Sequence, residues 1–296
     1  MATGGQVAKG GIAGAGRRRL AWGMIEIRAM VAAEVPLAVE WAAREGWNPG
    51  LADIPAFLAE DSGGFLLAEE DGRPLACISA TKYGTDFGFI GFYIADPEAR
   101  GRGHGIAVWR AAMARLQGRV IGLDGVVAQQ ANYRASGFAL AWNNARYMAA
   151  APVLPPPPAL LPAASLPFAA LVDYDAACFG TPRPAFLRAW IETPGHVALA
   201  LPGLRGFGVI RPCREGAKIG PLFADTAGDA AALLAGLGAA LPGPLTLDVP
   251  EDHAAAVAMA RGAGMEKVFE TARMYAGPPP AMTREKMFGI TSFELG

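Results

Sequence analysis

An excess of charge of one sign is missing from this 296-residue sequence. Its 26 lysines and arginines oppose 27 aspartates and glutamates, which leaves a net charge of −1. Proteins that bind the phosphates of nucleic acid or an anionic membrane surface normally carry a clear basic excess. The balance therefore disfavours both classes of partner, and we expect no nucleic acid and no membrane among the partners of this protein.

Cysteine is scarce, with three residues in the chain and no Cys-x-x-Cys pair. This scarcity excludes a disulfide framework and a zinc knuckle. We expect Cys77, Cys178 and Cys213 to be reduced, buried thiols of a cytoplasmic protein. His196 and His253 have no cysteine or carboxylate at ligand spacing, so we expect no metal site.

Long apolar runs are missing as well, because no stretch reaches the roughly 18 residues that a membrane-spanning helix needs. Residues 1–23 are rich in glycine and alanine without periodicity, and we expect them to form a disordered N-terminal extension. Apolar residues make up 52% of the chain and charged residues 18%, which is enough apolar material for substantial cores. The length favours two domains.

Proline is concentrated in one place. Residues 149–167 read AAAPVLPPPPALLPAASLP, and four consecutive prolines cannot supply backbone donors to a helix or a sheet. We interpret 149–167 as a semi-rigid linker between a first domain, 24–148, and a second domain, 168–296.

The first half has a mixed pattern of strands and helices. Asp71-Gly72 is a hairpin signal between two strand-like runs, and several other segments show helical spacing. The order predicts an α/β arrangement. The predicted strands are 25–30, 65–69, 74–82, 87–94, 120–127 and a closing pair within 138–148, and the predicted helices are 33–44, 49–60, 106–116 and 129–136.

The second half repeats landmarks of the first half in the same order, which indicates a diverged copy. The offsets between the paired landmarks are nearly constant, at 124 to 129 positions. Because Asp124 and Asp248 occupy equivalent places in both halves, we expect them to be structural rather than catalytic. The paired segments are Phe92–Asp96 with Pro221–Asp225, Leu123–Asp124 with Leu247–Asp248, Gly137–Phe138 with Gly264–Met265, and Ala145–Met148 with Ala272–Tyr275.

The two copies differ at a glycine-rich segment, Arg100–Gly105 (RGRGHG). It opens a predicted helix, where free backbone N–H groups and the positive end of the helix dipole favour an anion such as pyrophosphate. Glycine permits positive φ and close approach of a phosphate, and Arg100 and Arg102 add charge. The second half has only Thr226–Asp229 there, so we expect the first half alone to bind the anion. An ordinary strand-to-helix loop is the alternative.

The segment YIADPEARGRGHG resembles the R/Q-x-x-G-x-G/A coenzyme A motif of the GNAT superfamily of N-acyltransferases, and Tyr133–Phe138 resembles its Y-x-x-x-G-F motif. Longer strings resemble a two-domain bacterial subfamily in which a second GNAT-like domain follows the first. The resemblance implies an α/β (α+β) fold of tandem GNAT-like domains, each a mixed, mostly antiparallel twisted sheet flanked by helices. These strings are EGWNPG (Glu45–Gly50), LDGVVAQQANY (Leu123–Tyr133), REGAKIGPLFAD (Arg214–Asp225) and FGITSFELG (Phe288–Gly296).

The resemblance also implies acetyl-CoA as co-substrate and assigns residues to its binding. Main-chain amides of the glycine-rich segment would bind the pyrophosphate, and the strand ending at Tyr93, Ile94 and Ala95 would line the pantetheine arm and the acyl carbonyl. The asparagine that the family often has seven positions before its tyrosine is replaced by Val126, and Asn132 is its substitute. The pyrophosphate residues are Arg100, Gly101, Arg102, Gly103, His104 and Gly105, with His104 acting through its backbone.

Tyr133 matches the family position that protonates the leaving thiolate. A phenol suits this role because its ordinary pKa of about 10 keeps it protonated at neutral pH. A core tyrosine that anchors a short helix is the alternative.

No general base can be identified from the sequence. Glu45, Asp53 and Asp86 are candidates in segments expected to flank the acceptor cleft, and a solvated surface position is the alternative for each. We take Glu45 as the base or as an acceptor contact. The predicted substrate contacts are Trp47, Asn48, Asp86 and Tyr93.

The sequence therefore predicts an acyl-CoA-dependent N-acyltransferase that moves an acetyl group to a primary amine of a small molecule or peptide. The second half would shape the acceptor cleft or a homodimer. The alternative is a non-catalytic sensor or scaffold that binds coenzyme A or acyl-CoA, and the missing base and asparagine favour it.

Overall fold

The computed structural model describes residues 18–19 and 24–296. Arg18–Arg19 form strand β1, which pairs with β2 (Met24–Ala29), so these two residues do not behave as part of a disordered extension. The rest of the predicted extension, 1–17 and 20–23, lies outside the described residues.

The first half follows the predicted order of elements, with one correction. Residues 139–149 form the single strand β7 instead of a pair of strands, because this segment has no glycine or proline to turn it and pairs with a strand on each side. The other elements are α1 (Val35–Arg44), α2 (Ile54–Glu60), β3 (Phe65–Glu70), β4 (Arg73–Tyr83), β5 (Phe87–Ala95), α3 (His104–Arg115), β6 (Val120–Val126) and α4 (Gln130–Ala135).

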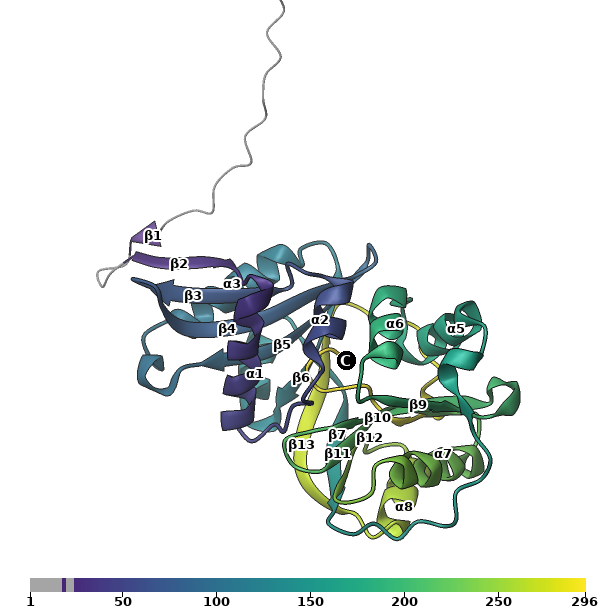
Figure 1. The fold of residues 1–296 in the computed structure, drawn as a ribbon. Helices are drawn as coiled ribbons and strands as arrows, with labels where there is room; N and C mark the ends of the chain where they lie inside the picture. The colour runs from purple at the N-terminus through teal and green to yellow at the C-terminus, as the bar shows by residue number, and fades with distance from the viewer. Residues whose placement is uncertain (1–17, 20–23) are drawn as a thin grey trace, which may run out of the picture.

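The second half repeats this order, as the sequence landmarks predict, and adds one strand at the end (Figure 1). Its elements are β8 (Leu161–Pro162), α5 (Phe168–Phe179), α6 (Pro184–Glu192), β9 (Val197–Ala200), β10 (Gly206–Pro212), β11 (Ala217–Ala224), α7 (Ala227–Ala240), β12 (Leu245–Pro250), α8 (Ala254–Gly262), β13 (Glu266–Ala276) and β14 (Met287–Gly289).

The proline-rich segment is packed against the second half. Leu154 and Leu160 contact the hydrophobic core beside α7, where Gly238 and Gly236 leave room for them. A Cβ on Gly236 would lie 2.2 Å from Cδ1 of Leu160. The segment also contributes β8, which pairs with β9. Residues 149–167 therefore do not act only as a spacer.

The two halves exchange their closing strands. The described strands form one continuous sheet in the order β1-β2-β3-β4-β5-β6-β13-β7-β12-β11-β10-β9-β8. In this order β13, from the second half, lies between β6 and β7 of the first half, and β7 in turn pairs with β12 of the second half. Figure 1 shows β13 in yellow running into the first half.

Adjacent parallel strands separate at the same place in each half. In the first half β5 pairs with β6 only over Phe87–Ile90, although both strands continue beyond that point. In the second half the equivalent pair, β11 and β12, is bonded only over Ala217–Ile219. There β14 fills the gap, because it pairs with β11 and the N–H of Ile290 donates to the carbonyl oxygen of Asp248 in β12.

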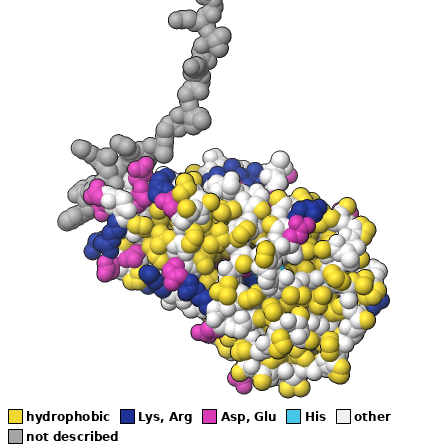
Figure 2. Space-filling model, in the orientation of Figure 1, with side chains coloured by type: hydrophobic (Ala, Val, Ile, Leu, Met, Phe, Trp, Pro, Cys, Tyr) yellow, Lys and Arg dark blue, Asp and Glu magenta, His cyan; other side chains and the backbone are white. Residues whose placement is uncertain are grey.

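Helices α2 and α6 join the halves through a shared hydrophobic core. The rings of Phe57 in α2 and Trp190 in α6 stack with centroids 6.0 Å apart. On the face shown in Figure 2, hydrophobic side chains spread over the second half, whereas charged side chains gather at the edge of the first half. In the described part of the chain, no helix is both long and apolar enough to cross a membrane.

Candidate active site

A cavity of about 650 Å³ opens where β5 and β6 separate. Its walls come from β5, β6, the start of α3 and Tyr133 of α4. The second half also contributes, through Phe269 and Thr271 of β13 and through Phe293 and Glu294 near the C-terminus. The exchange of closing strands therefore places residues of both halves around one cavity.

The glycine-rich turn borders this cavity as the sequence predicts. Gly101 and Gly103 have φ values of +77° and +88°, which L side chains rarely adopt. Apart from the neighbouring residues of the turn, no atom in the described part of the chain lies within 4 Å of a Cβ placed on either residue, so the turn faces open space. Gly103 is the N-cap of the twelve-residue helix α3, whose first N–H groups have no partner within the helix. The turn thus has the geometry of an anion site.

Arg100 and Glu45 form an ion pair at the rim of the cavity, and Nε of Arg100 donates to the carbonyl oxygen of Ala95 at 3.1 Å. Both side chains line the cavity, together with Gly105. The exposed Arg102 and the buried His104 of the same turn are not among the lining residues. Glu45, predicted as a base or acceptor contact, instead lies beside the residue expected to bind phosphate.

β5 changes its backbone geometry where it borders the cavity. Phe92 has a φ of +48°, and the pairing of β4 with β5 shifts register between Cys77 and Ser79. Such a bulge leaves a residue unpaired in the ladder. Tyr93, Ile94 and Ala95, predicted to line a ligand, follow this point and do line the cavity.

Tyr133 lies against β6 and borders the cavity. A Cβ on Gly125 would lie 2.1 Å from Cε2 of Tyr133, so only glycine allows this approach. The ring is also 5.6 Å from that of Trp109, centroid to centroid. Burial, with a smaller contribution from the nearby Tyr93, raises the pKa of Tyr133 to about 12. The phenol therefore stays protonated at neutral pH.

Three predicted contacts do not meet the cavity. Asn132 is exposed on α4, where it donates to Gln129. Asn48 binds the backbone of Glu215 through both ends of its amide, at 2.9 and 3.0 Å, and so fastens the two halves. Asp86 is exposed in the turn that precedes β5, at the opposite end of that strand from the cavity. Their positions do not support contact with a ligand in this cavity.

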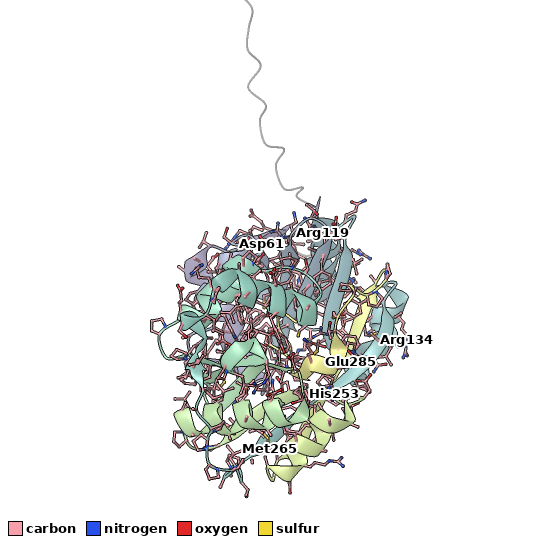
Figure 3. The ribbon with its side chains drawn as sticks, turned by 90° about the vertical axis from the view of Figure 1, so that its right-hand side faces the viewer. Asp61, Arg119, Arg134, His253, Met265 and Glu285 are labelled. Atoms are coloured by element: carbon pink, nitrogen blue, oxygen red, sulfur yellow. The ribbon has the colours of Figure 1, made fainter. Side chains whose placement is uncertain are left out.

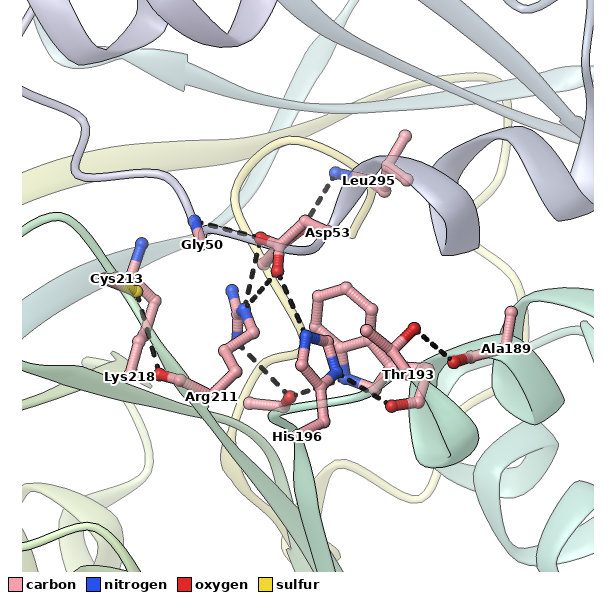
Figure 4. Close-up of polar contacts among 12 residues, drawn as sticks. Gly50, Asp53, Ala189, Thr193, His196, Arg211, Cys213, Lys218 and Leu295 are labelled. Carbon is pink, nitrogen blue, oxygen red and sulfur yellow. Dashed lines mark hydrogen bonds and ion pairs between the residues drawn. The ribbon is translucent and has the colours of Figure 1, made fainter. Parts of the chain in front are cut away.

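Asp53, the remaining candidate base, lies in a buried cluster between the halves (Figure 4). Its carboxylate pairs with Nε of Arg211 at 3.1 Å and lies 3.6 Å from Nε2 of His196. Burial disfavours the charged carboxylate, but the Arg211 guanidinium, the contact with His196 and the Lys218 ammonium outweigh it and lower the pKa of Asp53. This arrangement makes Asp53 a link between the halves.

Sequence reasoning missed Glu294 and Phe293. The terminal string FGITSFELG signals the subfamily, but a string gives no indication of which cavity it lines. In the described part of the chain, no group of three or more histidine, cysteine, aspartate or glutamate side chains is arranged to hold a metal ion.

Comparisons with known proteins relate both halves of the chain to acetyltransferases. A model of the acetyltransferase (GNAT) family matches residues 32–140, and a model of an acetyltransferase (GNAT) domain matches residues 171–289. A holothin acyltransferase from Pseudoalteromonas sp. (strain SANK 73390) is 29% identical over 263 residues, which cover 87% of this chain and 90% of that protein.

Two solved structures share the fold. A putative acetyltransferase from Pyrococcus horikoshii has a TM-score of 0.81 at 20% identity, over 96% of this chain and 99% of that chain. A tandem GNAT protein from the clavulanic acid biosynthesis pathway has a TM-score of 0.58 at 15% identity, over 86% of this chain and 99% of that chain. The predicted fold class, with two related α/β domains, is confirmed.

Proposed function

Because the chain belongs to the GNAT acetyltransferase family and contains two GNAT domains, we propose that it transfers an acetyl group from acetyl-CoA to a primary amine. One observation carries the proposal. The glycine turn, the open edge of β5 and the Tyr133 phenol border a single cavity. An anion site, a row of backbone donors and an acid at one cavity match the parts of an acyl-CoA molecule.

The donor would bind along the first half. The amides at the start of α3 would hold the pyrophosphate, with Arg100 adding a charge-assisted contact. Glu45 would fix the position of Arg100 and not act as the base. Beyond Ile90, β5 has no ladder partner on its β6 side among the residues that the structure describes, so its backbone is available to the pantetheine arm and to the oxygen of the acyl carbonyl.

Tyr133 would supply the proton that the leaving thiolate needs. Its raised pKa keeps the phenol protonated at neutral pH, which an acid requires before the reaction. The ring is fixed between Gly125 and Trp109, so the Tyr133 side chain is held at the cavity wall. The new bond joins the acceptor nitrogen to the acyl carbon, and the bond from that carbon to sulfur breaks.

The second half would complete the acceptor side of the cavity through Phe269, Thr271, Phe293 and Glu294. We accordingly assign donor binding to residues 24–148 and acceptor shaping to residues 168–296. The relative named holothin acyltransferase supports acyl transfer, and holothin is one acceptor to test. The three buried free thiols fit a reducing compartment, and we keep the cytoplasm as the proposed location.

The direct test is turnover. The protein is incubated with labelled acetyl-CoA and a panel of primary amines, and both labelled amide and free coenzyme A thiol are measured. We expect the two products in equal amounts. Tight binding of acetyl-CoA without turnover of any amine would favour the alternative, a coenzyme A sensor or scaffold, and contradict this proposal.

A further inference from the structure

The C-terminal segment passes through both halves in turn. After β14 fills the gap between β11 and β12, the chain continues to the cavity of the first half. A Cβ on Gly220 would lie 2.3 Å from the carbonyl oxygen of Thr291, and a Cβ on Gly91 would lie 1.9 Å from that of Glu294. Gly91 and Gly220 are 129 positions apart and occupy equivalent places in the repeat. One tail thus crosses both equivalent strands.

This tail is held firmly. Residues 287–296 are all buried, and Figure 1 places the C-terminus between α2 and α6. The Tyr83 hydroxyl donates to the carbonyl oxygen of Leu295 at 2.9 Å, and Nη2 of Arg183 donates to Oγ1 of Thr291 at 2.7 Å. These contacts on both sides of Glu294 fix its backbone at the cavity wall.

The Glu294 side chain has a position that the fold alone does not explain. The residue is 3% exposed and lines the cavity, yet its Oε1 has no hydrogen-bond partner among the described residues. Burial of a carboxylate oxygen without a hydrogen-bond partner is costly, because the oxygen loses its contacts with water and gains none in exchange. This is the type of group that a ligand completes.

Three buried cations lie near enough for the charge of Glu294 to act on their pKa values, but each has other contacts. Arg146 binds Asp248 through two hydrogen bonds, and Arg211 pairs with Asp53. Burial lowers the pKa of Lys218, whereas Glu294 opposes that effect. None of these cations lies within ion-pair distance of the Glu294 carboxylate.

We propose that Glu294 binds the acceptor amine and takes its proton, an inference that rests on the proposed acetyl transfer. The acceptor enters as an ammonium ion, and the Glu294 carboxylate removes one proton so that the nitrogen lone pair is free to attack. After the carbon–nitrogen bond forms, the nitrogen loses a second proton to solvent, and Glu294 releases the proton it took to solvent and becomes a carboxylate again. Tyr133 protonates the departing thiolate and recovers its proton from solvent, so one proton is released overall.

The surroundings of Glu294 also indicate the class of acceptor. Phe293, Phe269 and Trp47 line the same cavity, and the rings of Phe269 and Phe293 have centroids 6.1 Å apart. The other acidic side chains of the lining are paired, Glu45 with Arg100 and Asp124 with Arg273. One unpaired carboxylate beside aromatic walls fits a monoamine with an apolar, aromatic body better than a polyamine.

The test compares Glu294→Gln with Glu285→Gln. Glu285 precedes β14 on the same segment and is exposed beside His253, as Figure 3 shows, so it is a matched control. The probes are acetyl-CoA with 2-phenylethylamine and with spermidine. We expect Glu294→Gln to lower kcat/KM for 2-phenylethylamine by at least ~10²-fold, through both kcat and the amine KM. The affinity for acetyl-CoA should be unchanged, and Glu285→Gln should match the wild type.

The outcomes separate this inference from the proposed function. If the wild type acetylates the amine and Glu294→Gln does so at a rate within twofold of the wild type, the proposed role of Glu294 is overturned, but the proposed acetyl transfer is not. A wild-type preference for spermidine would overturn the acceptor class. A wild type that acetylates no amine would overturn the acetyl transfer itself, and the role of Glu294 with it. If Glu294→Gln fails to fold, the variant Glu294→Asp replaces it in the test. This variant keeps the carboxylate but withdraws it by one methylene group. It should retain acetyl-CoA binding, and its kcat should fall at least tenfold.

Discussion

Asp124 and Arg273 lie 149 positions apart and form a buried, two-pronged ion pair, with N–O distances of 2.8 and 2.6 Å. Asp248 and Arg146 form the equivalent pair, at 2.7 and 2.8 Å. In each pair the arginine belongs to the closing strand of one half and the aspartate to the facing strand of the other. The repeated aspartates and arginines therefore fasten the exchanged strands.

Removal of one partner should destabilise the protein strongly. Arg273→Met leaves the buried Asp124 charge with the amide of Asn144 as its remaining side-chain partner. We expect the free energy of unfolding to fall by about 3–5 kcal/mol, measured by urea denaturation. The double variant with Asp124→Asn should recover at least half of that loss, since no uncompensated charge remains. A loss below about 1 kcal/mol in the single variant would contradict this role.

The sequence predicts the repeat but not the exchange. The hydrophobic pattern of β7 or β13 is the same whether the strand closes its own half or the other half, because either site buries the same faces. The choice depends on pairings more than 100 positions apart, such as Asp248 with Arg146, which a single sequence does not reveal.

The exchange predicts that neither half folds alone. Fragments 1–156 and 157–296, cut within the proline run, should each lack a cooperative unfolding transition, because each contains a closing strand without its neighbours. The two fragments expressed together should associate and unfold as one unit. Size-exclusion chromatography and near-ultraviolet circular dichroism would show this. Cooperative unfolding of fragment 157–296 by itself would rule out the exchange as a requirement for folding.

The site was predictable where the chemistry lies within one short segment. The turn at Gly101 and Gly103 and the phenol of Tyr133 each have a local pattern, and all three line the cavity. Asn48 and Asp86, predicted as substrate contacts, have no such local pattern, and their positions depend on tertiary contacts. Glu294 has no local pattern, because its place in the cavity depends on the path of the whole C-terminal segment.

Gly103→Val tests the anion site, with Gly72→Val as its control. Both glycines have positive φ, +88° and +76°, and open space around a Cβ, but Gly72 lies in the turn between β3 and β4. Both variants should lose about 1–2 kcal/mol of stability from backbone strain. Gly103→Val alone should weaken acetyl-CoA binding, by at least ~10-fold in calorimetry. Equal affinities in the two variants would remove the turn from the donor site.

Tyr133→Phe tests the acid. The change removes one oxygen from a ring that is held by Gly125 and Trp109, so stability and acetyl-CoA affinity should stay close to those of the wild type. We expect kcat to fall by roughly 10²-fold, which is the lower end of what a positioned acid contributes. Steady-state rates at saturating amine measure this fall.

The decisive measurement for Tyr133 uses a series of acyl donors that differ in the acidity of the thiol. A more acidic thiol leaves without help, so the loss caused by Tyr133→Phe should shrink as the leaving group improves. A tyrosine that only packs against α3 would slow good and poor leaving groups by the same factor. Equal losses across the series would therefore remove Tyr133 from the proton transfer and leave water as the acid, with the rest of the donor site unaffected.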